Sequence, residues 1–111
     1  MAPARLGEFE QQLLLVILRL GDEAHAATVA RELEERARRR TTRGALYTTL
    51  DRLEVKGLVR WRAEAGGPAR EGLPRRLYAV TPAGRAALRA SRAVLEELWR
   101  GVEHLLGKPG A

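Results

Sequence analysis

The chain has 111 residues, which is enough for one small domain with a modest core. It contains no cysteine, so disulfides, thiolate metal sites and cysteine nucleophiles are excluded. No apolar run is long enough to span a bilayer and the N-terminus lacks a secretory pattern, so we expect a cytoplasmic protein.

The net charge of +6 is unevenly distributed along the chain. Residues 1–35 carry 3 basic and 7 acidic side chains, residues 36–76 carry 12 and 4, and residues 77–111 carry 5 and 3. The three segments therefore have net charges of −4, +8 and +2. A basic excess confined to one segment is typical of a nucleic-acid-binding surface.

Two helices are expected in the first third of the chain. The first runs from Glu8 to Leu20 and ends at Gly21, with one apolar face formed by Phe9, Leu13, Val16, Ile17 and Leu20. Its other faces are also apolar, which predicts a second buried surface formed by Leu14, Leu15 and Leu18. The second helix is expected from about Ala26 to Arg38, with Thr28 as one possible cap.

Three consecutive arginines, Arg38 to Arg40, precede the third helix. They are interpreted either as a clamp on phosphate groups or as cations that are favourable at a helix C-terminus. Both interpretations remain open.

The third helix is expected to begin at Thr42 or Thr41, either of which can cap it, and to end at Lys56–Gly57. Its buried side holds Leu46, Leu50 and Leu53. Considered alone, the helix is a surface helix whose remaining polar residues face solvent. The basic charge instead favours a recognition helix in a DNA major groove, with candidate contacts at Thr42, Arg43, Tyr47, Thr48 and Arg52. Arg43 and Thr48 are expected at base edges, whereas Tyr47 is alternatively half-buried with its hydroxyl near a phosphate.

A β-hairpin is expected next. Alternation between Leu58 and Ala63 predicts a strand with Val59, Trp61 and Ala63 on one face, and residues 76–80 predict a second strand. Glycine and proline predict a loop over residues 65–74. A basic hairpin can follow a phosphate backbone, and its candidate contacts are Arg70, Arg75 and Arg76. For Arg70 alone, a solubilising loop is the simpler interpretation.

The last helix is expected to start at Thr81–Pro82 and to run to about Leu106. Its steps of three and four residues are typical of a coiled-coil seam, formed by Leu88, Ser91, Leu95, Leu98, Val102 and Leu105. This stripe is longer than so small a core requires. It predicts a homodimer held by Leu14, Leu15, Leu18, Leu88, Leu95, Leu98, Trp99, Val102 and Leu105, with part of the helix packed on its own first helix.

The motifs in this order resemble the PadR family of winged-helix transcriptional regulators. The resemblance extends from Leu6 to about Leu106 and rests on L-G-E-F-E-Q, A-R-E-L-E-E, G-A-L-Y-T-T-L-D-R-L-E-V-K-G-L-V and R-R-L-Y-A-V-T-P-A-G. It implies a dimeric DNA-binding regulator, usually a repressor and often relieved by a small molecule. One departure is His25–Ala26, where the family commonly has an aromatic residue followed by glycine.

The predicted fold is mainly α with a small β-hairpin, in the order helix-helix-helix-strand-strand-helix of a winged helix-turn-helix. Residues 1–80 are expected to form the DNA-binding domain, and residues 81–111 a dimerisation helix packed on it. The expected function is repression at a palindromic DNA operator, relieved by a small aromatic effector at Trp99. Alternatively, Trp99 simply packs at the dimer interface, or the fold is a protein-interaction or RNA-binding module.

No enzyme site is expected in this chain. The two histidines, His25 and His104, lie far apart and lack ligand-spaced neighbours. Gly66–Gly67 lacks the strand and helix context of a phosphate loop. We therefore expect no catalytic residue, metal or cofactor.

Overall fold

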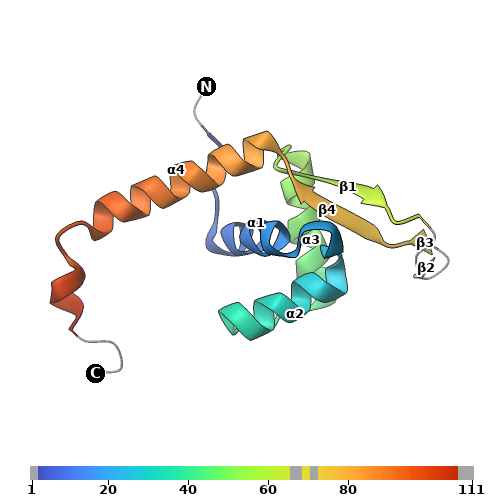
Figure 1. Ribbon diagram of the computed structural model, residues 1–111, viewed down its shortest axis with the longest axis horizontal. Coiled ribbons are helices and arrows are strands. Elements are labelled where there is room, and N and C mark those ends of the chain that lie inside the picture. The colour runs from blue at the N-terminus through green and yellow to red at the C-terminus, as the bar shows by residue number, and fades with distance from the viewer. Residues whose placement is uncertain (1–2, 66–68, 71–72, 108–111) are drawn as a thin grey trace.

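The computed structural model describes residues 3–65, 69–70 and 73–107. Three helices, one hairpin and a fourth helix follow in order, with short 3-10 turns η1 and η2 (Figure 1). This order confirms the predicted winged helix-turn-helix. The elements are α1 (Glu8–Leu20), η1 (Gly21–Glu23), α2 (Ala26–Ala37), α3 (Arg43–Val55), β1 (Val59–Ala63), β2 (Ala69–Arg70), β3 (Leu73–Pro74), β4 (Arg76–Val80), α4 (Pro82–Trp99) and η2 (Glu103–Leu106).

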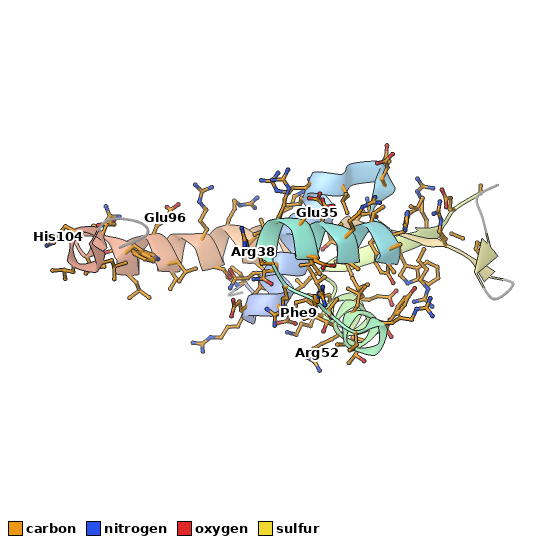
Figure 2. All side chains as sticks on the ribbon, turned by 90° about the horizontal axis from the view of Figure 1, so that it is seen from below. Phe9, Glu35, Arg38, Arg52, Glu96 and His104 are labelled. Atoms are coloured by element: carbon orange, nitrogen blue, oxygen red, sulfur yellow. The ribbon has the colours of Figure 1, made fainter. Side chains whose placement is uncertain are left out.

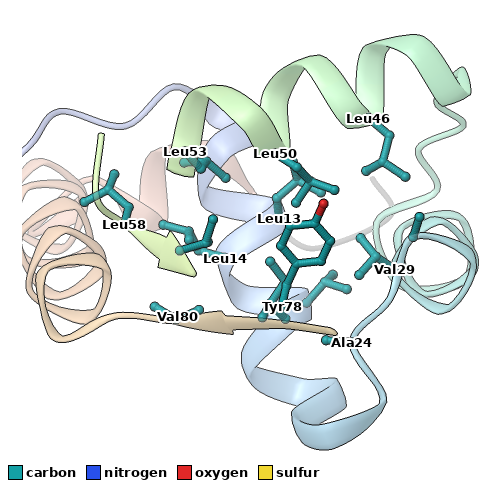
Figure 3. Packing of buried hydrophobic residues seen from close by; sticks show 14 of the residues in the cluster. Leu13, Leu14, Ala24, Val29, Leu46, Leu50, Leu53, Leu58, Tyr78 and Val80 are labelled. Carbon is teal, nitrogen blue, oxygen red and sulfur yellow. The ribbon is translucent and has the colours of Figure 1, made fainter. Parts of the chain in front are cut away.

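The core lies between α1, α2, α3 and the inner face of the hairpin (Figure 3). The predicted leucines of α3, Leu46, Leu50 and Leu53, are at most 2% exposed. They pack onto α1, where Leu14 is also fully buried. The prediction that Leu14 belongs to an exposed dimer face is therefore wrong: both α3 and the hairpin cover α1, so its buried face is wider than one helical stripe.

The strands β1 and β4 pair antiparallel, from Val59 opposite Val80 to Ala63 opposite Arg76. Val59, Tyr78 and Val80 are buried on the inner face. The N–H of Tyr78 donates to the carbonyl of Ala24 at 2.8 Å, so the segment between α1 and α2 lies along the second edge of β4. The predicted loop over residues 65–74 needs correction, because β2 and β3 pair within it and prolong the hairpin.

The end of α3 is joined to the start of α4. Thr81 caps α4 by accepting from the N–H of Gly84 at 3.0 Å, as predicted, and its own hydroxyl donates to the carbonyl of Gly57 at 2.6 Å. The N–H of Thr81 also donates to the carbonyl of Leu58 at 3.0 Å. A Cβ placed on Gly84 would lie 2.3 Å from that same carbonyl oxygen. The first turn of α4 and the segment between α3 and β1 therefore meet without room for a side chain.

Helix α4 projects away from the packed helices, and its C-terminal half is exposed (Figure 1). The sequence predicted an end near Leu106, but the helix ends at Trp99. The backbone turns at Gly101, which has a φ of +81°. Val102 and Leu105 therefore lie beyond the helix, and the predicted continuous seam is interrupted there. In the part of the chain that the structure describes, no helix is both long enough and apolar enough to cross a membrane.

Candidate nucleic-acid interface

One side of α3 is buried and the other is exposed and polar. Thr42 caps the helix by accepting from the N–H of Ala45 at 3.1 Å, which leaves Arg43 as the first helical residue. Arg43, Thr48 and Arg52 are exposed. Thr48 and Arg52 are one turn apart and share one side of the helix (Figure 2 labels Arg52), whereas Arg43 lies in the first turn on a different side. No salt bridge involves Arg43 or Arg52 among the described residues. Two guanidinium groups on this helix therefore remain available to an outside partner.

Tyr47 occupies an intermediate position on α3. Its side chain is half-buried and packs against the core, which matches the alternative placement considered for it. The side chain of Thr49 turns back onto the helix and donates to the carbonyl of Ala45 at 2.9 Å. The exposed surface of α3 is therefore narrower than its polar sequence suggests.

Two of the three arginines predicted for the hairpin already bind side chains of the same chain. Arg75 Nε donates to Glu64 Oε2 at 2.7 Å, and this contact holds the pKa of Glu64 below its usual range. The Arg76 guanidinium lies 4.2 Å from the centre of the Trp61 ring and 3.7 Å from a carboxylate oxygen of Asp51. Arg70 belongs to β2, but its side chain lies outside the described part of the structure.

The contact between Arg76 and Asp51 places the hairpin beside α3. Asp51 is exposed on the same side of α3 as Thr48 and Arg52, so β4 begins next to this polar surface. The neighbouring Tyr78 is buried, and its burial raises the pKa of its hydroxyl. The start of β4 and the exposed side of α3 around Asp51 can therefore contact one extended partner.

Arg60 and Arg62 are two candidate contacts that the sequence analysis missed. They alternate along β1, are exposed, and form no salt bridge among the described residues. Their partners across the hairpin are Ala79 and Leu77. The alternation of arginine with Val59 and Trp61 is the sequence signal that could have identified them, because residues two apart on a strand share one face.

The arginines after α2 have different environments. Arg38 is exposed and caps the helix in a left-handed conformation with φ of 52°. Arg39 lies 4.4 Å from the centre of the Phe9 ring, and its Nη1 donates to Gln12 Oε1 at 3.1 Å. Arg40 pairs with Glu34 at 3.1 Å. These contacts stabilise the turn between α2 and α3. Arg38 is the arginine of this turn that makes no such side-chain contact among the described residues.

A second surface lies between α1 and the projecting part of α4. It forms a groove of about 860 Å³ with an apolar lining of Leu15, Leu18, Leu88, Leu95 and Trp99. Leu15, Leu95 and Trp99 are each about half exposed. Charged residues such as Glu96 line its rim on the projecting helix (Figure 2). An exposed apolar groove of this kind indicates a binding surface.

Comparison with known proteins gives consistent results. Residues 14–90 match the Transcriptional regulator PadR-like family. The chain is 44% identical over 81 residues to the transcriptional regulator Rv3488 of Mycobacterium tuberculosis, a match that covers 73% of this chain and 71% of that protein.

Solved structures resemble the chain over most of its length. A PadR-like transcription factor from Bacteroides fragilis is 31% identical, with a TM-score of 0.63 and coverage of 87% of this chain and 88% of that one. A PadR family regulator from Clostridium difficile is 20% identical, with a TM-score of 0.70 and coverage of 91% and 100%, and this likeness concerns the fold. The resemblance inferred from the sequence motifs is therefore confirmed.

Proposed function

The chain belongs to the PadR-like family of transcriptional regulators, and we propose that it represses transcription as a homodimer on a palindromic DNA operator. The observation that carries the proposal is the exposed polar surface of α3. Thr48 and Arg52 flank Asp51, which contacts Arg76 of the hairpin, and Arg43 is exposed in the first turn of the helix. A helix with this surface suits the major groove, where arginine can bind guanine through two hydrogen bonds.

In this proposal the helix and the hairpin have different roles. Arg43 and Thr48 contact base edges, whereas the hairpin arginines other than Arg75, including Arg60 and Arg62, contact phosphates. Arg75 is already bound to Glu64. Phosphate contacts contribute to affinity for every sequence, and base contacts discriminate between sequences. Substitutions in the hairpin should therefore weaken all DNA binding alike.

The test measures fluorescence anisotropy with DNA from upstream of the protein's own gene and with a scrambled duplex. Arg43→Ala should reduce discrimination at one base position by about 1–3 kcal/mol. Arg62→Ala should reduce the slope of log affinity against log salt by about 0.9, which is the value for one phosphate contact. Arg5→Ala is the matched control, since it removes an exposed arginine near α1. The assignment fails if Arg43→Ala leaves both affinity and discrimination unchanged.

We propose that residues 81–111 and the exposed side of α1 form the dimer interface. Leu15, Leu18, Leu95 and Leu98 are between 41% and 67% exposed in the single chain. Burial of each leucine contributes roughly 1.5–3 kcal/mol, so several per subunit suffice for a stable dimer. A two-fold dimer also presents two recognition helices to the two halves of a palindrome.

Sedimentation at micromolar concentration tests the dimer. Leu98→Asp should produce monomer or aggregate, because it places a charge in the interface. Val55→Asp is the matched control: Val55 is 89% exposed on α3, outside the groove, so this variant should remain dimeric. A wild-type protein that sediments only as monomer would contradict the proposal.

We propose that a planar aromatic effector binds in the groove beside Trp99. Trp99 is 46% exposed in the single chain, so part of its indole ring is available to a ligand held between the two subunits. Stacking on an indole ring contributes about 0.5–1.5 kcal/mol beyond the buried area. Planar aromatic compounds should quench Trp99 fluorescence in a Trp61→Phe background and reduce DNA affinity. If no planar aromatic compound quenches Trp99 or changes DNA affinity, Trp99 only packs at the dimer interface.

A further inference from the structure

Three side chains from separate segments meet just beyond the end of the β1–β4 pair, on the side of β2 and β3. Arg75 Nε donates to Glu64 Oε2 at 2.7 Å, and Arg75 Nη1 lies 3.2 Å from His25 Nε2. Glu64 follows β1, Arg75 precedes β4, and His25 is the residue before α2. All three are half-buried. We call this set the hairpin anchor, because it connects the hairpin to the first turn of α2.

The hydrogen-bonding groups fix the protonation state of His25. A guanidinium group has only donors, so His25 Nε2 must act as the acceptor in the contact with Arg75. The imidazole is then neutral and carries its proton on Nδ1. A protonated ring would instead bring two donors and two positive charges to 3.2 Å. The contact between Arg75 and His25 therefore exists only while His25 is neutral.

The surroundings of His25 favour the neutral form. Burial lowers its pKa most, and the positive charges of Arg75 and Arg31 lower it further. The carboxylates of Glu64 and Glu23 act in the opposite direction. Arg75 and Glu64 are neighbours across the hairpin, Arg31 belongs to α2 and Glu23 to η1. The resulting pKa of His25 lies below its ordinary value of 6.5.

We propose that the hairpin anchor sets the direction of the hairpin relative to α2 and α3, and that Arg75 is a positioning residue rather than a phosphate contact. The inference rests on the proposed function, since it assumes that the hairpin lies along DNA. Arg75 Nε binds Glu64 and Arg75 Nη1 binds His25, so neither nitrogen is free to bind a phosphate. The N–H of Glu64 also donates to the carbonyl of Arg75 at 2.8 Å. Protonation of His25 breaks the contact between Arg75 and His25 and loosens the hairpin beyond β1 and β4, while the N–H of Tyr78 still binds the carbonyl of Ala24.

The first experiment measures hairpin direction in the free protein, without DNA. The chain has no cysteine, so Glu35→Cys in α2 and Ala65→Cys beyond β1 provide two specific sites for spin labels. Labelled chains are diluted with unlabelled protein so that distances within one chain are measured. Arg75→Ala should broaden the distance distribution, whereas Arg62→Ala, which removes a hairpin arginine outside the anchor, should not. An unchanged distribution in Arg75→Ala overturns the anchor whether or not the protein binds DNA.

The second experiment separates positioning from phosphate contact. Arg75→Ala should weaken DNA binding about tenfold at every salt concentration, a typical size for coupling between two sites. The slope of log affinity against log salt should stay unchanged, because no phosphate contact is lost. A slope reduced by about 0.9 would show that Arg75 contacts a phosphate and would overturn its positioning role. A wild-type protein with no DNA affinity contradicts the proposed function, while the spin-label result still decides the anchor.

The third experiment uses the two histidines of the chain. Wild-type affinity for DNA should fall as the pH decreases below 6.5, because the pKa of His25 lies below that value. His25→Gln should remove this dependence, because its amide oxygen accepts from Arg75 without titrating. His104→Gln, in the exposed turn η2, should retain it. If His25→Gln keeps the wild-type pH profile, protonation of His25 does not loosen the hairpin.

Discussion

Gly84→Ala tests the close contact between the first turn of α4 and Leu58, which lies between α3 and β1. Alanine ordinarily stabilises a helix relative to glycine, by up to about 1 kcal/mol. Here the new Cβ would lie 2.3 Å from the carbonyl oxygen of Leu58 and 2.7 Å from Val80 Cγ1, where ordinary contacts begin at 3.4 Å. The carbonyl of Leu58 cannot retreat freely, because it accepts a hydrogen bond from the N–H of Thr81.

The first turn of α4 must therefore shift by about 1 Å, which is the shortfall from ordinary contact. Overpacking typically costs about 1–3 kcal/mol, and loss of one hydrogen bond adds about 1 kcal/mol. The gain in helix propensity offsets only part of this. We expect Gly84→Ala to lower the free energy of unfolding by about 1–3 kcal/mol.

Gly44→Ala is the matched control. Gly44 also lies in the first turn of a helix, but nothing is within 4 Å of the position of its Cβ. It should stabilise the protein by up to about 1 kcal/mol. Urea unfolding followed by circular dichroism measures both variants at one protein concentration, because the stability of a dimer depends on concentration. A Gly84→Ala protein as stable as wild type would refute the reasoning from steric overlap.

Two further predictions concern charge and backbone conformation. The Glu10 carboxylate lies 2.7 Å from Lys56 Nζ and accepts from the N–H of Gly7, and although burial acts to raise its pKa, these two hydrogen bonds lower the pKa below 4.5. Glu10→Gln should therefore reduce the free energy of unfolding by about 1–2 kcal/mol at pH 7. The difference from wild type should shrink as the pH falls below 4.5, because the wild-type carboxylate becomes protonated as the pH passes through its lowered pKa. An equal difference in the free energy of unfolding at pH 7 and at pH 3 would contradict this. Arg38→Gly should raise the free energy of unfolding by about 0.5–1 kcal/mol, because glycine adopts the left-handed conformation of Arg38 without a steric penalty. A lower midpoint of urea unfolding in the variant would show that this backbone conformation does not strain Arg38.

Local signals in the sequence predicted the helices well. The bounds of α1 and the caps Thr42 and Thr81 agree with the structure, because each depends on residues within one or two turns of the chain. The end of α4 was predicted less well. A glycine inside an apolar helical pattern is compatible with either a continuous helix or a break. In this chain the helix breaks, and Gly101 adopts a left-handed conformation.

Features that depend on distant residues could not be predicted in the same way. Leu14 is buried because several elements cover α1, and the apolar pattern of one helix does not reveal how many neighbours it has. The contacts of Arg75 reach Glu64 and His25, which are 11 and 50 residues away in the chain. An arginine in a basic loop looks available for a phosphate until its tertiary partners are known.

The junction between Gly57 and Thr81 also has a mechanical consequence. Helix α4 has 18 residues, which gives a rigid rod about 27 Å long that is hinged where α3 ends. A tilt of 5° at this junction displaces the far end of α4 by about 2 Å. A shift of about 2 Å near Trp99 therefore requires a rotation of only a few degrees next to the C-terminal end of α3. The close approach at Gly84 makes the hinge stiff, and a stiff hinge transmits movement in both directions.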